Sequence, residues 1–319
     1  MIRARVIARF PRLWVLWAAS RPSQLALILL LYLLGIGLST AGPPIIEGDP
    51  PATNLADFEH SSLFVPVIAG AIALLLTAVA IHYANEYADI DTDARTTRTP
   101  FSGGSGAMVE TGLSPAFLFT AMIVMGIGAL AVTGVLTVGR IFPIRASVLL
   151  LLGLVFGLAY SLPPIALVRQ GIGEPVNMAL GGLVLPIYGV AVVAVPTFYA
   201  ALAVVPFTLV VGCNLLAVHW PDRVADEAVG KRTTAVRWSP ARIRFAYATL
   251  AILAAVIVLL LWVVSIMPTI VALAHLPPVP FLLWGWTTLT RERSPLPAVT
   301  AMVVLAIALT IAWWWIGLG

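Results

Sequence analysis

The hydrophobic positions of this chain form long continuous runs that polar stretches separate. Nine such runs stand out, and each is close to the ~20 residues that a helix needs to cross the hydrocarbon core of a bilayer. They lie near residues 24–42, 62–84, 115–138, 146–162, 176–195, 197–217, 244–267, 269–289 and 296–317. Because the runs are continuous and do not alternate, they favour helices over a membrane β-barrel. The pattern predicts an all-α integral membrane protein with nine transmembrane helices.

The composition points to lipid as the main surroundings of this protein. Of the 319 residues, 61% are hydrophobic and 10% are charged, whereas soluble domains have roughly 45–50% apolar and about 25% charged residues. A soluble fold of this length could not cover its surface with so few charges. We therefore expect one transmembrane domain over residues 1–319. The single cysteine, Cys213, excludes an intrachain disulfide.

The basic residues predict the orientation of the nine spans. With the N-terminus in the cytoplasm, all but two of the 18 basic residues fall on the cytoplasmic side, the exceptions being Arg140 and Arg145. This asymmetry follows the positive-inside rule. We predict a multi-pass protein of the cell inner membrane with its C-terminus outside. The basic residues are spread along membrane-flanking loops, so we expect no nucleic-acid partner. The oligomeric state is left open.

Two polar loops, 85–114 and 218–243, lie on the predicted cytoplasmic side and are the candidate sites of function. The first begins with Asn85, Asp89 and Asp93, which are spaced at i, i+4 and i+8. If the preceding helix continues through them, the three side chains project from one face.

The second loop carries a similar carboxylate pair. Asp222 and Asp226 are spaced at i and i+4, and Asn214 lies two turns before them. Like charges one turn apart are unfavourable on a helix, and hard divalent cations prefer carboxylate oxygen. Two such clusters predict a site for Mg²⁺ and a diphosphate. The plainer alternative is that these are solvated loop charges.

The positions of the clusters suggest an internal repeat. Four predicted spans separate Asp89 from Asp222, and four crossings return the chain to the same side of the membrane. We therefore expect two four-helix repeats plus one helix, with both clusters at the cytoplasmic ends of helices.

These residues resemble the UbiA superfamily of intramembrane prenyltransferases. Asn85-x-x-x-Asp89-x-x-x-Asp93 is similar to its first aspartate-rich motif, although the family more often has Asp where Glu86 stands. Asp222-x-x-x-Asp226, followed by Gly230-Lys-Arg-Thr-Thr-Ala-Val-Arg237, is similar to the second. The family pattern is also nine helices.

Three stretches look most like the 1,4-dihydroxy-2-naphthoate polyprenyltransferases of menaquinone biosynthesis. They are Ser20-Arg21-Pro22, Tyr160-Ser-Leu-Pro-Pro164 with Gly171-Ile-Gly-Glu174, and Gly230-Lys-Arg-Thr233. The segment His219-Trp220-Pro221 departs from the more usual form. The departure leaves other acceptors open: 4-hydroxybenzoate, homogentisate, a glycerol phosphate ether lipid, chlorophyllide or haem.

The resemblance implies a role for each matching position. Asn85, Asp89 and Asp93 would hold one Mg²⁺, and Asp222 and Asp226 another. Arg98 and Lys231 would contact the diphosphate, Asn214 would help to bind substrate, and Tyr160 would lie near the reacting carbon. By topology, either Arg169 or Lys231 could meet the carboxylate of the acceptor. Asp91 is expected to be a loop charge, Glu174 either to anchor a loop or to orient the acceptor, and His219 to be a polar loop residue or to assist proton removal.

The implied reaction transfers a prenyl chain from a prenyl diphosphate to an aromatic ring. Two other classes compete with it. A cation-coupled transporter is expected to place its carboxylates near the membrane midplane, whereas here they crowd at one face. A CDP-alcohol phosphotransferase is expected to have a continuous glycine-containing aspartate pattern, which residues 89–95 lack.

Overall fold

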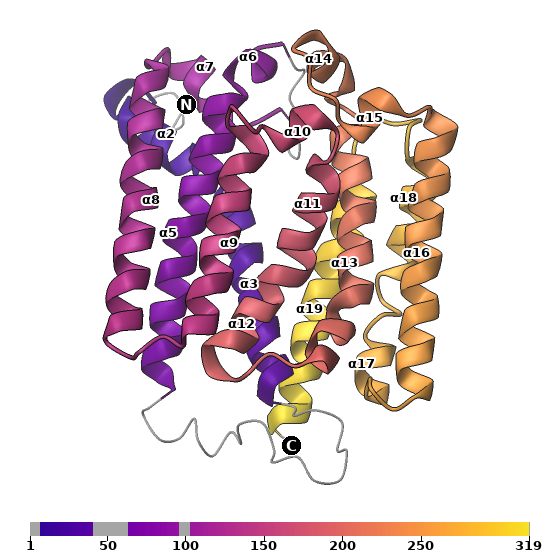
Figure 1. The fold of residues 1–319 in the computed structure, drawn as a ribbon. Coiled ribbons are helices and arrows are strands. Elements are labelled where there is room, and N and C mark those ends of the chain that lie inside the picture. The colour runs from indigo at the N-terminus through magenta and orange to yellow at the C-terminus, as the bar shows by residue number, and fades with distance from the viewer. Residues whose placement is uncertain (1–6, 41–62, 96–102, 319) are drawn as a thin grey trace.

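The chain forms a bundle of long helices in the computed structural model, which describes residues 7–40, 63–95 and 103–318 (Figure 1). No β-strand occurs in these residues. The long helices are α3 (Pro22–Thr40), α5 (Phe64–Ala88), α8 (Pro115–Val138), α9 (Ile144–Ser161), α13 (Phe198–His219), α16 (Pro240–Val263) and α19 (Leu296–Leu318). One further span is built from α11 (Gly173–Ala179), the π-helix η1 (Leu180–Val184) and α12 (Leu185–Val193).

Short helices cover the ends of the bundle or interrupt the chain between the long ones. They are α2 (Pro11–Ala19), α6 (Ile90–Asp93), α7 (Ala107–Thr111), α10 (Leu167–Gln170), α14 (Arg223–Ala228), α15 (Thr234–Arg237), α17 (Thr269–Leu273) and α18 (Val279–Thr288). The sequence pattern did not predict α2, which directly precedes α3.

Eight helical stretches in the described residues are long and apolar enough to cross a membrane. They correspond to eight of the nine predicted segments. The remaining segment, 269–289, is divided into α17 and α18 because Pro277 and Pro278 interrupt the helix, whereas Pro280 lies in the first turn of α18. The two pieces together still return the chain from the end of α16 to the start of α19 (Figure 1). The predicted count of nine spans and the internal repeat are therefore not confirmed.

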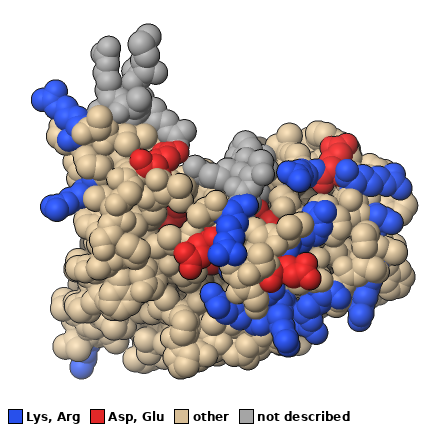
Figure 2. Space-filling view, turned by 90° about the horizontal axis from the view of Figure 1, so that it is seen from above, with Lys and Arg blue, Asp and Glu red and all other residues tan. Residues whose placement is uncertain are grey.

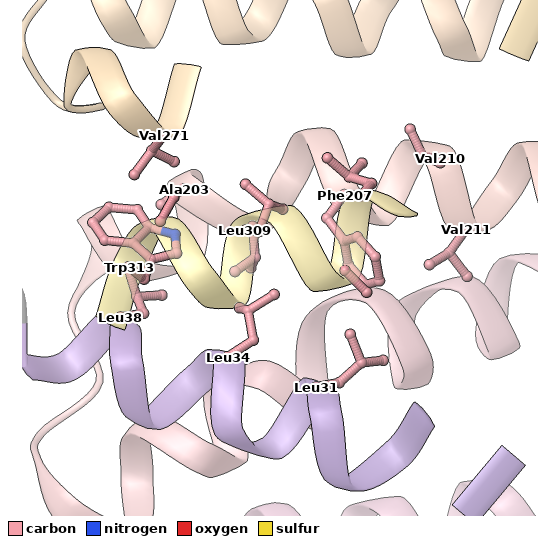
Figure 3. Packing of buried hydrophobic residues seen from close by; sticks show 14 of the residues in the cluster. Leu31, Leu34, Leu38, Ala203, Phe207, Val210, Val211, Val271, Leu309 and Trp313 are labelled. Atoms are coloured by element: carbon pink, nitrogen blue, oxygen red, sulfur yellow. The ribbon is translucent and has the colours of Figure 1, made fainter. Parts of the chain in front are cut away.

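The main core holds α3, α13 and α19 together (Figure 3). Leu34 on α3, Phe207 on α13 and Leu309 on α19 are almost completely buried in it. In lipid, such packing depends on close contact and small residues, because the surrounding tails are as apolar as the side chains. Gly35 is such a small residue, and it lets α3 pack closely against α12. A Cβ at this position would lie 1.9 Å from the carbonyl oxygen of Pro186 on α12.

The polar connections gather at one end of the bundle. Figure 1 shows α6, α7, α10, α14 and α15 at the same end as α2, whereas the C-terminal end of α19 lies at the other end. The described parts of the loops 85–114 and 218–243 meet at this end, because α6 contacts α14.

Candidate active site

The first carboxylate cluster lies at the junction of α5 and α6. The helix breaks at Asp89, but the backbone N–H of Asp89 donates to the carbonyl of Asn85 at 3.0 Å and that of Asp93 donates to the carbonyl of Asp89 at 2.8 Å. The i, i+4, i+8 relation therefore survives the break. Asn85 Nδ2 also donates to Asp89 Oδ2 at 3.2 Å and to Ser161 Oγ, on α9, at 3.1 Å.

The second cluster lies where α13 gives way to α14. Asp222 is the N-cap residue of α14, and the backbone N–H of Asp226 donates to the carbonyl of Asp222 at 2.9 Å. The turn is braced by Arg223, whose guanidinium lies 3.8 Å from the ring centroid of Trp220 and donates to its carbonyl. Asp226 is buried, with 3% of its surface exposed.

Lys231 joins the two clusters. Its Nζ lies 2.7 Å from Asp89 Oδ1 and 3.5 Å from Asp226 Oδ1. The loop that carries it folds back onto α14, since the N–H of Lys231 donates to the carbonyl of Asp226 at 2.9 Å and Thr233 Oγ1 donates to Asp226 Oδ2 at 3.4 Å. Two carboxylates far apart in the sequence therefore meet at one buried ammonium group.

The electrostatics of this site favour an additional cation. Burial, together with the charges of Glu86 and Asp89, raises the pKa of Asp93 to about 7. Burial also raises the pKa of Asp226 against the opposing charge of Lys231. Burial lowers the pKa of Lys231, but Asp89 and Asp226 outweigh it, so the net pKa is raised. The site thus places one ammonium among several carboxylates.

This donor chemistry fits Mg²⁺. Asp89, Asp93, Asp222 and Asp226 supply carboxylate oxygens, and Asn214 Oδ1 is a buried amide oxygen without a hydrogen-bond partner. Within the described part of the chain, no three Asp, Glu, His or Cys side chains converge as a complete metal site. Mg²⁺ commonly uses only one or two carboxylates and takes its other ligands from water and phosphate oxygens.

Glu86 is a site residue that the sequence analysis did not select. It is almost fully buried, with 2% exposed, and its Oε2 lies 3.1 Å from Arg21 Nη2. It also accepts the backbone N–H of Ser105 at 2.9 Å to Oε1 and 3.1 Å to Oε2. Its position directly after Asn85, in a motif that otherwise carries aspartates, was the available signal.

Glu174 links the α9–α11 connection to the Lys231 loop. Its Oε1 accepts hydrogen bonds from the backbone N–H of Thr234 and pairs with His219 Nδ1 at 3.2 Å. Glu174 is 6% exposed. Of the two roles expected for Glu174, these contacts are those of a loop anchor. His219 lies in this pair at the end of α13 and is mostly buried.

The remaining candidates fall in different places. Tyr160 is half-buried at the end of α9, where its ring contacts Gly173, and its hydroxyl lies within electrostatic range of Glu174, Asp89 and Asp226. Arg169 is exposed on α10 and takes part in none of the contacts above. Asp91 is exposed, as expected for a loop charge. Arg98 lies outside the described residues.

The site lies at the end of the bundle that carries the polar connections. Figure 2 shows this end from above, with the acidic side chains and many of the basic side chains gathered on it. Acidic and basic side chains therefore share one face of the molecule.

Comparison with solved structures gives the same fold at low sequence identity. A UbiA homolog from Archaeoglobus fulgidus bound to DMAPP and Mg²⁺ superposes with a TM-score of 0.66 at 14% identity, over 95% of this chain and 98% of that one. The same homolog bound to GPP and Mg²⁺ gives a TM-score of 0.66 at 14% identity, over 96% and 99%. A digeranylgeranylglyceryl phosphate synthase gives 0.62 at 12% identity, over 95% and 99%.

Sequence comparison identifies the family. No curated protein is similar enough to match. Residues 55–314 match the UbiA prenyltransferase family, and this region includes both carboxylate clusters, Lys231 and Tyr160. The chain therefore belongs to the UbiA prenyltransferase family.

Proposed function

We propose that this protein transfers a prenyl chain from a Mg²⁺-bound prenyl diphosphate to an aromatic acceptor, with 1,4-dihydroxy-2-naphthoate as the acceptor in menaquinone biosynthesis. The observation that carries the proposal is the meeting of Asp89 and Asp226 at Lys231. The A. fulgidus homolog supports it, since that protein binds DMAPP or GPP together with Mg²⁺.

The carboxylates of the two clusters would hold the metal ions and, through them, the diphosphate. Asn85, Asp89 and Asp93 would bind one Mg²⁺, and Asp222 and Asp226 the other. When bound, Mg²⁺ would draw electron density from the diphosphate oxygens and make the diphosphate a better leaving group. Asn214 would help to complete this site through its unpaired amide oxygen.

Lys231 would neutralise charge that develops on the leaving group. As the allylic C–O bond breaks, its electron pair departs with the diphosphate, and a preorganised ammonium stabilises that charge more than it stabilises the ground state. Lys231 is held in place by Asp89 and Asp226 before the substrate arrives, so it needs little reorganisation. Arg98 is proposed as a second cationic contact.

Tyr160 would face the allylic cation. The negative face of an aromatic ring attracts a cation, and the Tyr160 ring lies close to Gly173, at the start of α11. Burial of the site would limit the water that could quench the cation. The acceptor ring carbon then forms the new C–C bond. For dihydroxynaphthoate, the carboxyl-bearing carbon is the site of substitution and CO₂ leaves.

The acceptor prediction is tested by competition. Arg169 or Lys231 is proposed to bind the acceptor carboxylate. With a prenyl diphosphate and equal concentrations of acceptors, we expect dihydroxynaphthoate to be prenylated with release of CO₂ and 4-hydroxybenzoate to react poorly, as measured by mass spectrometry of the products. Preference for 4-hydroxybenzoate or homogentisate would reject the role in menaquinone synthesis. Modification of glycerol phosphate alone would reject the aromatic acceptor class.

The orientation in the membrane is proposed from the charge asymmetry. We place the end with α6 and α14 in the cytoplasm and the end of α19 outside, in the cell inner membrane. Cysteines introduced in 45–55 and in 225–230 are expected to be labelled from opposite sides by a membrane-impermeant maleimide. The native Cys213 is buried and provides little background. Labelling of both positions from one side would contradict this orientation.

A further inference from the structure

A short segment, residues 103–105, contacts both carboxylate clusters. The backbone N–H of Gly103 donates to Asp222 Oδ2 in the second cluster at 3.3 Å. The next residue, Gly104, packs against Asp93 in the first cluster so closely that a Cβ would lie 1.8 Å from Asp93 Oδ2. Because Gly103 and Gly104 have φ of +81° and +63°, other residues would adopt this backbone only with strain.

Glu86, on α5, anchors this segment through hydrogen bonds to Ser105. Both of its carboxylate oxygens accept the N–H of Ser105, and Ser105 Oγ donates to Oε1 as well. Arg21, the residue before α3, donates to Oε2 at 3.1 Å. A carboxylate that is 2% exposed and bound by an arginine and a backbone amide has little freedom to move. The segment is therefore tied to α5, next to Asn85 of the first cluster.

We propose that segment 103–105, anchored by Glu86 and Arg21, is a positioning element that fixes Asp93 and Asp222 relative to each other for the metal–diphosphate complex. This inference rests on the proposed function. The two aspartates belong to different loops and repel each other when charged. Lys231 connects the loops through Asp89 and Asp226, and segment 103–105 adds a second connection through Asp93 and Asp222. Groups that orient metal ligands typically change metal affinity or activity by 10–100-fold when they are removed.

The decisive experiment compares two glycines of the same loop. Gly104 and Gly112 both have positive φ, at +63° and +62°, but a Cβ on Gly104 meets Asp93, whereas a Cβ on Gly112 has nothing within 4 Å. G104A and G112A therefore impose the same type of backbone strain. The two variants differ in the contact with the cluster.

The direct readout is Mn²⁺ binding to the purified protein with inorganic diphosphate, followed by electron paramagnetic resonance. We expect G104A to weaken Mn²⁺ binding at least about tenfold and G112A to change it less than about twofold. In the prenyl-transfer assay, G104A should need a higher Mg²⁺ concentration for half-maximal rate. Equal Mn²⁺ affinities for G104A and G112A would overturn the inference.

A second series keeps the inference testable if G104A does not fold. Glu86→Gln retains an oxygen that can accept the N–H of Ser105, whereas Glu86→Ala removes it. The exposed Glu110, which accepts Trp14 Nε1, provides the control Glu110→Gln. We expect Mn²⁺ affinity to decrease from Glu110→Gln to Glu86→Gln and further to Glu86→Ala. Excess Mg²⁺ should restore much of the turnover of Glu86→Ala. Equal Mn²⁺ affinities across the series would overturn the inference.

Failure of this inference is distinguishable from failure of the proposed function. If the wild-type protein neither binds Mn²⁺ with diphosphate nor transfers a prenyl group, the proposed function fails and the positioning role fails with it. If the wild-type protein does both and G104A matches G112A, only the positioning role is wrong.

Discussion

Replacing Asp226 by alanine is expected to abolish prenyl transfer while leaving a folded protein in the membrane. Asp226 is buried, forms an ion pair with Lys231 and accepts a hydrogen bond from Thr233. It is also proposed to bind Mg²⁺. Metal stabilisation of a leaving group is worth several kcal/mol, and each 1.4 kcal/mol or so changes the rate about tenfold. Turnover should therefore fall by at least about a thousandfold. The same result is expected for Asp89→Ala.

A matched control separates the metal site from the general loss of an acidic residue. Asp91 lies on α6, beside the first cluster, but is exposed. Asp91→Ala should keep turnover within about twofold of the wild-type value, because surface substitutions usually have small effects. Product formation is measured in detergent, and folding by size-exclusion chromatography. Full activity in Asp226→Ala would remove that residue from the metal site.

Replacing Lys231 by methionine is expected to impair both catalysis and stability. Lys231 is buried between Asp89 and Asp226, so its removal leaves two carboxylates without their cation. Breaking a buried ion pair by removing one partner typically costs about 3–5 kcal/mol. We expect a lower Tm without Mg²⁺, and a larger rise in Tm on addition of Mg²⁺ than the wild-type protein shows.

Lys231→Arg is the control for charge. It keeps the cation but replaces a compact ammonium by a planar group that is poorly suited to the same space. We expect it to recover most of the stability and part of the turnover. If Lys231→Met has wild-type Tm and turnover, Lys231 neither balances the carboxylates nor assists the leaving group.

The spacing of residues along the sequence predicted the two clusters because that information is local. Asn85, Asp89 and Asp93 retain their i, i+4, i+8 relation through backbone hydrogen bonds even though the helix breaks at Asp89. The placement of both clusters at one end of the bundle followed from the number of spans between them. Lys231 carried a further signal that was not used, since it is the only lysine in the chain and every other basic residue is arginine.

Features that depend on tertiary contacts could not be predicted in this way. Nothing in the local sequence tells that Glu86 pairs with Arg21 and Ser105, or that Gly103 reaches Asp222. These contacts join segments that are far apart along the chain. The prolines of segment 269–289 indicate a helix break. Hydropathy alone, however, cannot distinguish one interrupted span from two short helices.

The central claim is that both clusters act together on one Mg²⁺-bound prenyl diphosphate. The most direct test is to give the purified wild-type protein a prenyl diphosphate and the panel of acceptors and to measure diphosphate release and prenylated product, with Mg²⁺ and after chelation. We predict that both products form together with Mg²⁺ and that neither forms after chelation. Diphosphate release and prenyl transfer that persist undiminished without metal, or their absence with every acceptor at saturating Mg²⁺, would contradict the account.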